Sequence, residues 1–434
     1  MNPAAERIDF SASLGYAGFL GESRKNAVAE VSRAANRKLK ENMKRVYLDN
    51  NATTQLAPEV FEAMRPYWLE DYGNASSIHW FGQRAKAAME KAREQVARLL
   101  NARASEIVFT SGGTESDNAA LFGIVEAARG ERKHVVSTAI EHHAVLNAAK
   151  ALEKRGVSVT YVRVGAGGVV DPADIERALR PETVLISVMH ANNELGTIQP
   201  LEEIGRLAGE RDIYFHTDAV QSAGKIPVDV GRLGVDMLSL SAHKLHGPKG
   251  VGALYIRKGT ILRPLMHGGH HERDRRPGTE NVAGIVGLGV AAELGLAHMP
   301  EELDRVAALR DRLEAGILER VPRVTVNGDR TRRLPTTTNL AFDYIEGEGF
   351  VIAMDLRGIA CSTGAACSSG SLEPSHVLSA IGLKPEQARA SIRFSLGRFT
   401  TPEDIDTTLH ILPAVVEQLR SVSPHYRSAV TSDK

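Results

Sequence analysis

Helical and strand-like patterns alternate along the chain from about residue 58 to residue 240, and this alternation constrains the fold more than any other feature. Apolar positions at helical spacing occupy 58–69, 84–100, 116–128, 145–155, 172–179 and 201–210. Short apolar runs lie between them or follow them, at 107–110, 134–137, 157–162, 183–189, 213–216 and 235–240. Strands that alternate with helices indicate a largely parallel sheet covered on both faces. We therefore predict an α/β fold.

The pattern changes after residue 282. Two successive helical stretches, 282–298 and 301–320, lead away from the alternating region. Strand-like runs at 324–326 and 338–342 follow, and then helices that end near residue 419. We predict a large domain over 54–298 and a smaller α+β domain formed by 43–53 together with 299–434.

Composition excludes several classes of protein. The chain has 434 residues with 53 basic and 53 acidic side chains, so neither a nucleic-acid partner nor a general membrane partner is expected. No run of about 18 apolar residues is evident, and we predict no transmembrane helix. The two cysteines, Cys361 and Cys367, form neither a disulfide framework nor a zinc pattern, which suits a reducing, cytoplasmic location.

The first 42 residues differ from the rest. They hold seven basic and five acidic residues and no apolar core, so they resemble neither a transit peptide nor a secretory signal. We predict a poorly ordered extension over 1–42, or an upstream mis-assigned start, with Met43 as the natural beginning.

A lysine stands just after the apolar run 235–240. The sequence there is Ser241-Ala242-His243-Lys244, followed by Gly-Pro and Lys-Gly. Ligands of α/β sheets lie beyond the carboxyl ends of the strands. A poorly solvated lysine at such a place can attack a carbonyl, and the aldehyde of pyridoxal phosphate is the obvious candidate. A surface lysine beside a turn is the alternative.

A glycine-rich segment joins another predicted strand to a helix. Its sequence is Ser111-Gly112-Gly113-Thr114-Glu115-Ser116, which matches neither a Walker A loop nor the dinucleotide fingerprint. Glycines allow close backbone approach, and a helix N-terminus favours an anion. A single phosphate fits best, although a plain turn capped by Thr114 or Ser116 is the alternative.

Polar side chains follow three further strands. Asp218 could pair with a pyridinium nitrogen, or it could simply cap a helix. Asn192-Asn193 could supply an amide to a ring hydroxyl, or it could form a turn. His142 could stack on an aromatic ring and move a proton, although a lone histidine is more often structural.

Three other segments carry reactive or charged groups. Cys367 lies among Gly, Ala, Ser and Thr, which suits an accessible reactive thiol, whereas Cys361 follows an apolar run and reads as a core residue. Arg393 alternates with apolar neighbours and could present its planar fork to a carboxylate. The histidines between Met266 and Arg273 lack metal-ligand spacing, so we predict no metal; a glycine loop that brings Thr279 near the phosphate is the alternative.

Together these segments resemble the cysteine desulfurases of the NifS/IscS type, which are fold-type I pyridoxal phosphate enzymes. The resemblance runs from Tyr47 to about Pro424. Its motifs are 49–54, 111–116, 189–196, 241–244, 366–375 and 393–400. It implies a large α/β domain with a mainly parallel seven-stranded sheet and a small α+β domain. The run 372–375 is similar to the long-loop class rather than the short-loop SufS class.

The resemblance also implies roles for individual residues. Lys244 would hold pyridoxal phosphate covalently, His142 would stack on its ring, Asp218 would pair with its nitrogen, and Gln221 and Asn193 would contact its hydroxyl side. The phosphate would be bound by Gly113, Thr114, Ser241 and His243, with Thr279 reaching it from the other subunit of a homodimer. Arg393 and Asn193 would bind the substrate carboxylate, and Cys367 would be the nucleophile that forms a persulfide.

The implied reaction converts L-cysteine to L-alanine and leaves the sulfur on Cys367 for an acceptor such as an iron–sulfur scaffold protein. Three alternatives remain: a selenocysteine lyase or other fold-type I lyase, a transaminase, and a non-catalytic sulfur-relay or scaffold protein. The sequence departs from the family at His270-His271, in the short tail after Ser423, and in residues 1–42.

Overall fold

The computed structural model describes residues 44–363, 374–424 and 426. Our predictions for residues 1–42 and for Cys367 lie outside these residues. The chain divides into two compact units, Met1–Val46 and Tyr47–Lys434, with the short strand β1 (Val46–Tyr47) at the division. The second unit carries the remaining elements of the described residues and is described here by itself.

The larger sheet of this unit has seven strands in the order β2-β8-β7-β6-β5-β3-β4. Their bounds are β2 Ile107–Thr110, β3 His134–Thr138, β4 Ser158–Val162, β5 Thr183–Ser187, β6 Tyr214–Asp218, β7 Met237–Ser241 and β8 Gly252–Ile256. Strands β3 to β7 pair in parallel, and β8 pairs antiparallel with both β2 and β7. The predicted α/β class with a mainly parallel seven-stranded sheet is confirmed, while β8 was not predicted.

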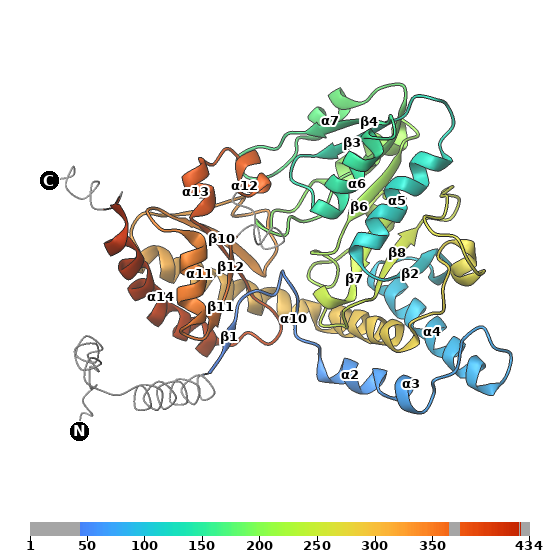
Figure 1. Ribbon diagram of the computed structural model, residues 1–434, viewed down its shortest axis with the longest axis horizontal. Helices are drawn as coiled ribbons and strands as arrows, with labels where there is room; N and C mark the ends of the chain where they lie inside the picture. The colour runs from blue at the N-terminus through green and yellow to red at the C-terminus, as the bar shows by residue number, and fades with distance from the viewer. Residues whose placement is uncertain (1–43, 364–373, 425, 427–434) are drawn as a thin grey trace, which may run out of the picture. The chain divides into compact units, whose positions relative to one another are not determined.

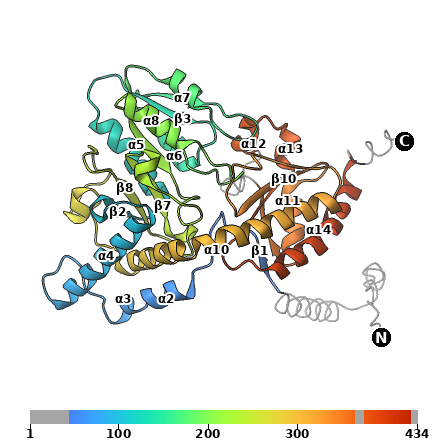
Figure 2. The ribbon, with the colours of Figure 1, turned by 180° about the vertical axis from the view of Figure 1, so that it is seen from behind.

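Helices cover both faces of this sheet (Figures 1 and 2). Successive strand residues point to opposite faces, so Val135 packs with one apolar cluster and Val136 with the other. The Val135 face lies under α5 (Gly113–Ala127) and α6 (His143–Glu153). The Val136 face lies under α4 (Trp80–Leu99), α7 (Pro172–Ala178), α8 (Leu201–Glu210), α9 (Val230–Leu233) and α10 (Val282–Arg320), with α2 (Pro58–Met64) and α3 (Pro66–Leu69) against α10. Burial on both faces explains why these strands read as continuous apolar runs.

A second, antiparallel sheet has the order β12-β13-β10-β9. Its strands are β9 Val324–Val326, β10 Thr337–Phe342, β12 Ser362–Thr363 and β13 Ser391–Ser395, and β11 (Ile359–Ala360) lies just before β12. The accompanying helices are α11 Gly347–Asp355, α12 His376–Ala380, α13 Pro385–Arg389 and α14 Pro402–Val422. Both sheets belong to the unit Tyr47–Lys434, and the finer domain boundaries at 54 and 298 stay a prediction.

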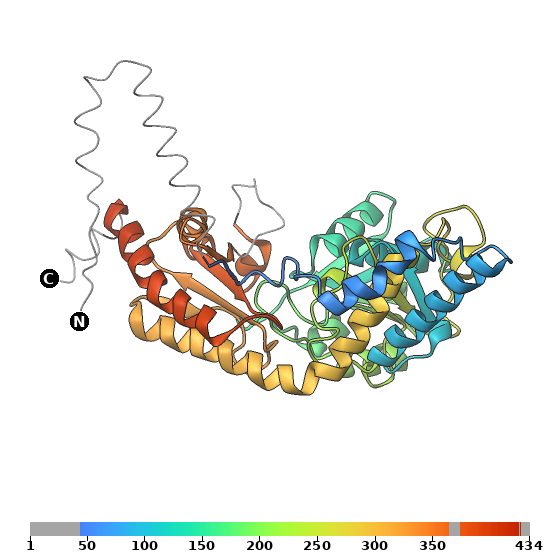
Figure 3. The same cartoon turned by 90° about the horizontal axis from the view of Figure 1, so that it is seen from below.

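Helix α10 joins the two sheets (Figure 3). It packs on α4 near its beginning and on α14 near its end, and it continues through Pro300. The two helical stretches that we expected are therefore one helix, because a proline removes one backbone hydrogen bond without ending a helix that packing holds on both sides.

Among the described residues, α10 alone is long and apolar enough to cross a membrane by length and composition, with a window of mean hydropathy 1.6. Our reading of the sequence missed this window. Since 56% of it is buried inside the structure, it has the character of a core helix.

The buried histidine His134 makes stability depend on pH. Its Nδ1 and Nε2 lie 2.8 and 2.9 Å from the hydroxyls of Thr183 and Thr160, and burial, with a smaller effect of Arg180, lowers its pKa from 6.5 to about 4. The folded state therefore favours the neutral form of the ring. The stabilisation that His134 gives to the folded state is present above pH 6.5 and is lost as the pH falls toward 4. We expect the stability difference between wild type and His134→Asn to shrink by about 1.4 kcal/mol per pH unit over this range.

Denaturant unfolding at pH 7, 6, 5 and 4.5 measures this difference. The exposed His267→Asn is the matched control and should follow the wild type at every pH. A His134→Asn difference that stays constant from pH 7 to 4.5 would contradict the prediction.

Candidate active site

A cavity of about 260 Å³ opens where the central parallel strands end. It is lined by Asn51, Ala52, Gly113, Thr114, Asp117, His142, Met189, Asn193, Asp218, Val220, Gln221, Ser241, His243, Lys244 and Arg393. Every predicted site residue except Thr279 and Cys367 is therefore in one place. The carboxyl ends of parallel strands are where α/β sheets bind ligands, so this is the candidate active site.

Lys244 ends the short 3-10 turn η2 (Ala242–Lys244) that directly follows β7. Its Nζ donates to the backbone oxygens of Asn51 and Ala52, at 2.6 and 2.7 Å. The other two lysines of the neighbourhood do not line this cavity: Lys225 faces a smaller one, and Lys249 is exposed. Lys244 is thus the amine that a ligand in the large cavity would meet.

The beginning of α5 forms one end of the cavity. Gly112 precedes the helix with φ of +154°, and no side chain caps the helix there. The alternative of a turn capped by Thr114 or Ser116 is therefore wrong: the hydroxyl of Ser116 lies 3.2 Å from the carbonyl oxygen of Gly112 and 2.8 Å from Thr110 Oγ1. A Cβ added at Gly113 would come within 2.6 Å of Val220 Cγ2, so glycine keeps the loop close to its neighbour. An uncapped helix N-terminus with a glycine approach suits an anion such as a phosphate.

Two buried carboxyl groups also line the cavity. Asp218 is the last residue of β6, and burial raises its pKa to about 6 although it accepts from the Val220 N–H at 2.9 Å. Asp117, from α5, is raised well above its usual pKa by burial and by the charge of Asp218. Asp117 Oδ1 is buried without a hydrogen-bond partner and lies 3.6 Å from His216 Nε2. A cationic ring nitrogen near these carboxyl groups would stabilise their charged forms and lower their raised pKa values, so a pyridinium fits.

His142 lies at the start of α6, where its Nδ1 accepts from the Ala144 N–H at 3.1 Å. Burial first, and then the charge of Lys244, lower its pKa to about 4. The ring is therefore neutral at pH 7, with its proton on Nε2. A neutral imidazole can lie against an aromatic ring, but with Nδ1 already accepting and a pKa of about 4 this ring is a weak proton acceptor.

Arg393 approaches the cavity from β13 of the smaller sheet. Its Nη1 donates to the backbone oxygen of Asn193 at 3.0 Å, and its Nη2 donates to Asp49 Oδ1 at 2.7 Å. Its Nε is buried and has no hydrogen-bond partner. A buried guanidinium with a spare donor can receive a substrate carboxylate.

Thr279 lies apart from the main cavity. It lines a second cavity, of about 120 Å³, together with Ser111, Glu272 and Arg276. Its predicted contact is with the partner's phosphate, which a single chain does not test. Nearby, Glu272 is paired with Arg93 at 2.7 Å, and His270 Nδ1 lies 2.5 Å from Asp274 Oδ1. Over the parts of the chain that the structure describes, no group of three or more His, Cys, Asp or Glu could hold a metal.

Two polar residues of the cavity escaped the sequence reading. Asn51 uses its backbone oxygen to accept from both Lys244 and Gln221, and its side chain donates to Thr337 Oγ1 at 2.9 Å. Its motif, 49–54, was noticed only through the resemblance. Asp117 stands one helical turn after Gly113, and that i+4 spacing is the signal that could have placed it on the cavity side of α5.

The fold and this cavity are those of a known class of protein. The chain belongs to the family "Aminotransferase class-V", whose model matches residues 46–408. Within it, the chain is 54% identical over 384 residues to "Cysteine desulfurase IscS" of Dictyoglomus turgidum, which covers 88% of this chain and 98% of that protein. It is 52% identical over 381 residues to the protein of the same name from Methanosarcina thermophila, with 88% and 94% covered.

Solved structures agree. A structure titled "NIFS-LIKE PROTEIN" is similar with a TM-score of 0.82 and 40% identity, over 86% of this chain and 100% of that one. A structure titled "SspA in complex with cysteine" has a TM-score of 0.74 and 41% identity, over 82% and 100%. The predicted family is confirmed.

Proposed function

We propose that this chain is a cysteine desulfurase, which converts L-cysteine to L-alanine and transfers the sulfur to Cys367 as a persulfide. The observation that carries the proposal is the joint occurrence, in one cavity, of Lys244, the buried carboxyl pair and the buried Arg393. Identity of 54% to a cysteine desulfurase across nearly the whole of that protein supports it.

The proposed cofactor is pyridoxal phosphate, which when bound withdraws electrons from the α-carbon of an amino acid. Lys244 would hold it, Asp218 would face its ring nitrogen, and the phosphate would lie at Gly113, Thr114, Ser241 and His243. His142 would cover the ring, and Gln221 and Asn193 would lie on its hydroxyl side. The orphaned Asp117 Oδ1 and the uncapped α5 are the features that such a group satisfies.

The chain's own residues then have distinct tasks. Arg393 and Asn193 bind the substrate carboxylate and so fix the α-carbon near Lys244. The Lys244 amine removes the α-proton and returns a proton when alanine forms. Cys367, as thiolate, attacks the substrate sulfur: a sulfur–sulfur bond forms, the carbon–sulfur bond breaks, and its electron pair stays on the carbon that becomes the methyl group of alanine. A thiol of pKa about 8.5 is only a few per cent thiolate at neutral pH, so a base is needed. His142 is proposed for that role, which requires a bound ligand to raise its pKa from about 4.

The deciding experiment measures alanine and sulfide released from L-cysteine by the purified protein loaded with pyridoxal phosphate, with a thiol reductant to discharge the persulfide. Equal release of both products is expected. A selenocysteine lyase would prefer selenocysteine and turn over without Cys367, and a transaminase would require a keto acid. A sulfur-relay protein would show no absorbance near 400 nm. The natural sulfur acceptor, such as an iron–sulfur scaffold protein, and a cytoplasmic location belong to the same proposal.

Arg393→Lys tests the carboxylate site. Lysine keeps the charge but loses the planar fork that also holds Asn193 and Asp49. We expect kcat/KM for cysteine to fall by about 10- to 100-fold, mainly through KM, because one charge-assisted interaction is lost. Steady-state kinetics with cysteine measures this. Arg398 pairs with Glu302 and does not line this cavity, so it cannot replace the contact. An unchanged KM in Arg393→Lys would therefore remove Arg393 from the substrate site.

We also propose a homodimer. Large apolar side chains are exposed around α3 and the start of α4: Trp68 56%, Leu69 68%, Tyr72 68%, Ile78 91% and Trp80 59%. Such a patch marks an interaction surface, and symmetric dimers are the commonest oligomers. Light scattering should give about twice the 46.9 kDa of one chain. Ile78→Asp should shift the mass toward one chain, whereas a fully active monomeric wild type would contradict the dimer.

A further inference from the structure

A second, partly buried lysine lies beside the proposed active site. Lys225, in the turn after β6, donates from Nζ to Gln221 Oε1 at 2.9 Å and to Asn51 Oδ1 at 3.3 Å. Gln221 Nε2 in turn donates to the backbone oxygen of Asn51 at 2.9 Å, and Lys244 Nζ donates to that same oxygen at 2.6 Å. Two lysines therefore meet at one asparagine, and Gln221 lies between them.

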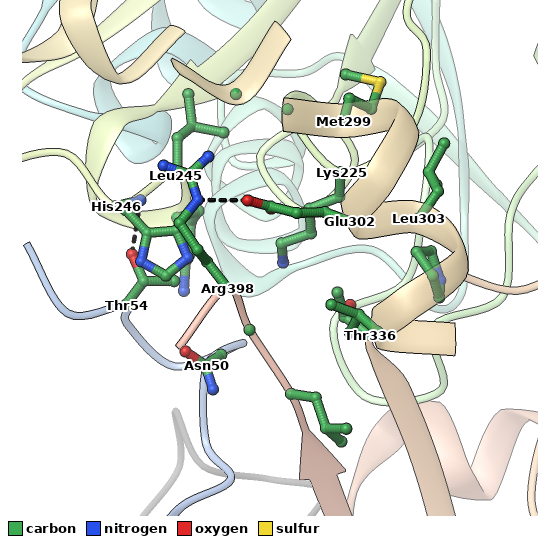
Figure 4. Close-up of a pocket in the computed structure, with 17 residues that line it drawn as sticks. Asn50, Thr54, Lys225, Leu245, His246, Met299, Glu302, Leu303, Thr336 and Arg398 are labelled. Carbon is green, nitrogen blue, oxygen red and sulfur yellow. Dashed lines mark hydrogen bonds and ion pairs between the residues drawn. The ribbon is translucent and has the colours of Figure 1, made fainter. Parts of the chain in front are cut away.

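Lys225 does not enter the large cavity. It lines a separate cavity of about 40 Å³ that also touches Lys244, shown in Figure 4 with Lys225, Glu302 and Arg398 labelled. The nearby carboxylate of Glu302 pairs with Arg398. The hydrogen bonds described for Lys225 go to the neutral amides of Gln221 and Asn51. Burial, followed by the charges of Lys244 and Arg393, lowers the pKa of Lys225 to about 7. Removing an amine from water costs free energy, and Lys225 does not line the ligand cavity, so its position needs a physical explanation.

The donor pattern supplies one. A lysine amine at Nζ offers hydrogens to its neighbours, and the protonated form has no acceptor. The oxygens of both amides do face Lys225 in the structure, as the protonated amine requires. With Oε1 of Gln221 turned to Lys225, only the NH₂ group of Gln221 is left for Asn51 and for the large cavity, which Gln221 also lines. With Oδ1 of Asn51 turned the same way, its Nδ2 donates to the backbone oxygen of Asn193 at 3.1 Å.

We propose that Lys225 is a positioning residue of the active site. It fixes the Gln221 amide with its donor toward the ligand, and it holds the side-chain oxygen of Asn51, the residue whose backbone oxygen accepts from Lys244. The inference rests on the proposed function, because Gln221 would then donate to the oxygen on the hydroxyl side of pyridoxal phosphate. Without Lys225, either amide can turn over and present an oxygen where a donor is needed. The effect reaches Lys244 through Asn51 rather than through direct contact with the ligand.

Lys225→Met tests the proposal, since it keeps the length and removes the donors. We expect pyridoxal phosphate to bind roughly tenfold more weakly, as judged by titration of the protein without cofactor. We also expect the absorbance band near 400 nm to shift, because the donor to the ring oxygen is no longer fixed. Lys225→Arg keeps a partly buried cation with donors and should retain most of the wild-type affinity and band. Lys249→Met, an exposed lysine of the same region, is the matched control and should behave as wild type.

A double-mutant cycle separates positioning from general packing. If Lys225 acts through Gln221, then Gln221→Leu and Lys225→Met weaken binding by overlapping amounts, and the double variant binds about as well as Gln221→Leu alone. The proposal would be overturned if the fold-losses in cofactor affinity of the two single variants multiplied in the double variant. A Lys225→Met protein with wild-type affinity and spectrum would overturn it as well. Should Lys225→Met not fold, Lys225→Gln enters the same cycle. A wild-type protein that binds no pyridoxal phosphate would instead refute the proposed function.

Discussion

Lys244→Ala is expected to lower alanine formation from cysteine by about 10⁴-fold or more, because it removes the group proposed to move the α-proton and to anchor the cofactor covalently. The structure favours Lys244 over its neighbours: it lines the large cavity, whereas Lys225 lies behind Gln221 and Lys249 is exposed. Steady-state assays of alanine release measure the loss. Lys249→Ala is the matched control and should retain wild-type turnover.

An independent measurement identifies the lysine itself. Borohydride reduction of the pyridoxal phosphate-loaded protein, followed by peptide mapping, should place the label on the peptide that contains Lys244. The thermal midpoint of Lys244→Ala without cofactor should stay close to that of the wild type, since the amine donates to the backbone oxygens of Asn51 and Ala52 rather than filling an apolar core. A label on Lys225 or Lys249 would overturn the assignment.

The sequence predicted the parts of the site that follow a strand directly. Asp218 ends β6 and Lys244 ends the turn after β7, so the apolar run before each residue was enough to place it at the carboxyl edge of the sheet. Because parallel strands bring these edges together, the pattern predicted both the fold and the meeting of these side chains. The family resemblance, which the comparisons confirm, added roles that spacing alone left open.

Contacts between distant segments escaped prediction for a physical reason. Asn51 reaches the site from a segment about 193 positions before Lys244, and no periodicity in the sequence couples the two. The pairing of Lys225 with Gln221 is local, yet its meaning depends on Asn51, which only the fold brings there. Strand β8 was missed because it pairs antiparallel between β2 and β7, against the alternation that predicted the rest.

The largest effect on sulfur transfer is expected at Cys367, and Cys361 provides the matched control. Cys361 is only 6% exposed, and burial raises the pKa of its thiol far above the usual range, so almost no thiolate forms at neutral pH. Cys361→Ala should therefore keep turnover and cost about 1 kcal/mol of stability as a small buried residue. Cys367 lies outside the described residues, and its assignment rests on its sequence context among small residues and on the family.

Cys367→Ala should still bind pyridoxal phosphate and cysteine, because Lys244, Asp218 and Arg393 are intact, yet sulfide release from cysteine should fall by about 10³-fold or more. The reason is chemical: the carbon–sulfur bond of cysteine breaks toward alanine only if another group accepts the sulfur, and Cys361 is too buried to replace Cys367. Sulfide and alanine assays of both variants measure this, and mass spectrometry of the wild type after one turnover should show one added sulfur atom on the peptide with Cys367. Normal turnover by Cys367→Ala together with an inactive Cys361→Ala would reverse the assignment. Normal turnover by both variants would instead favour a lyase that needs no protein thiol.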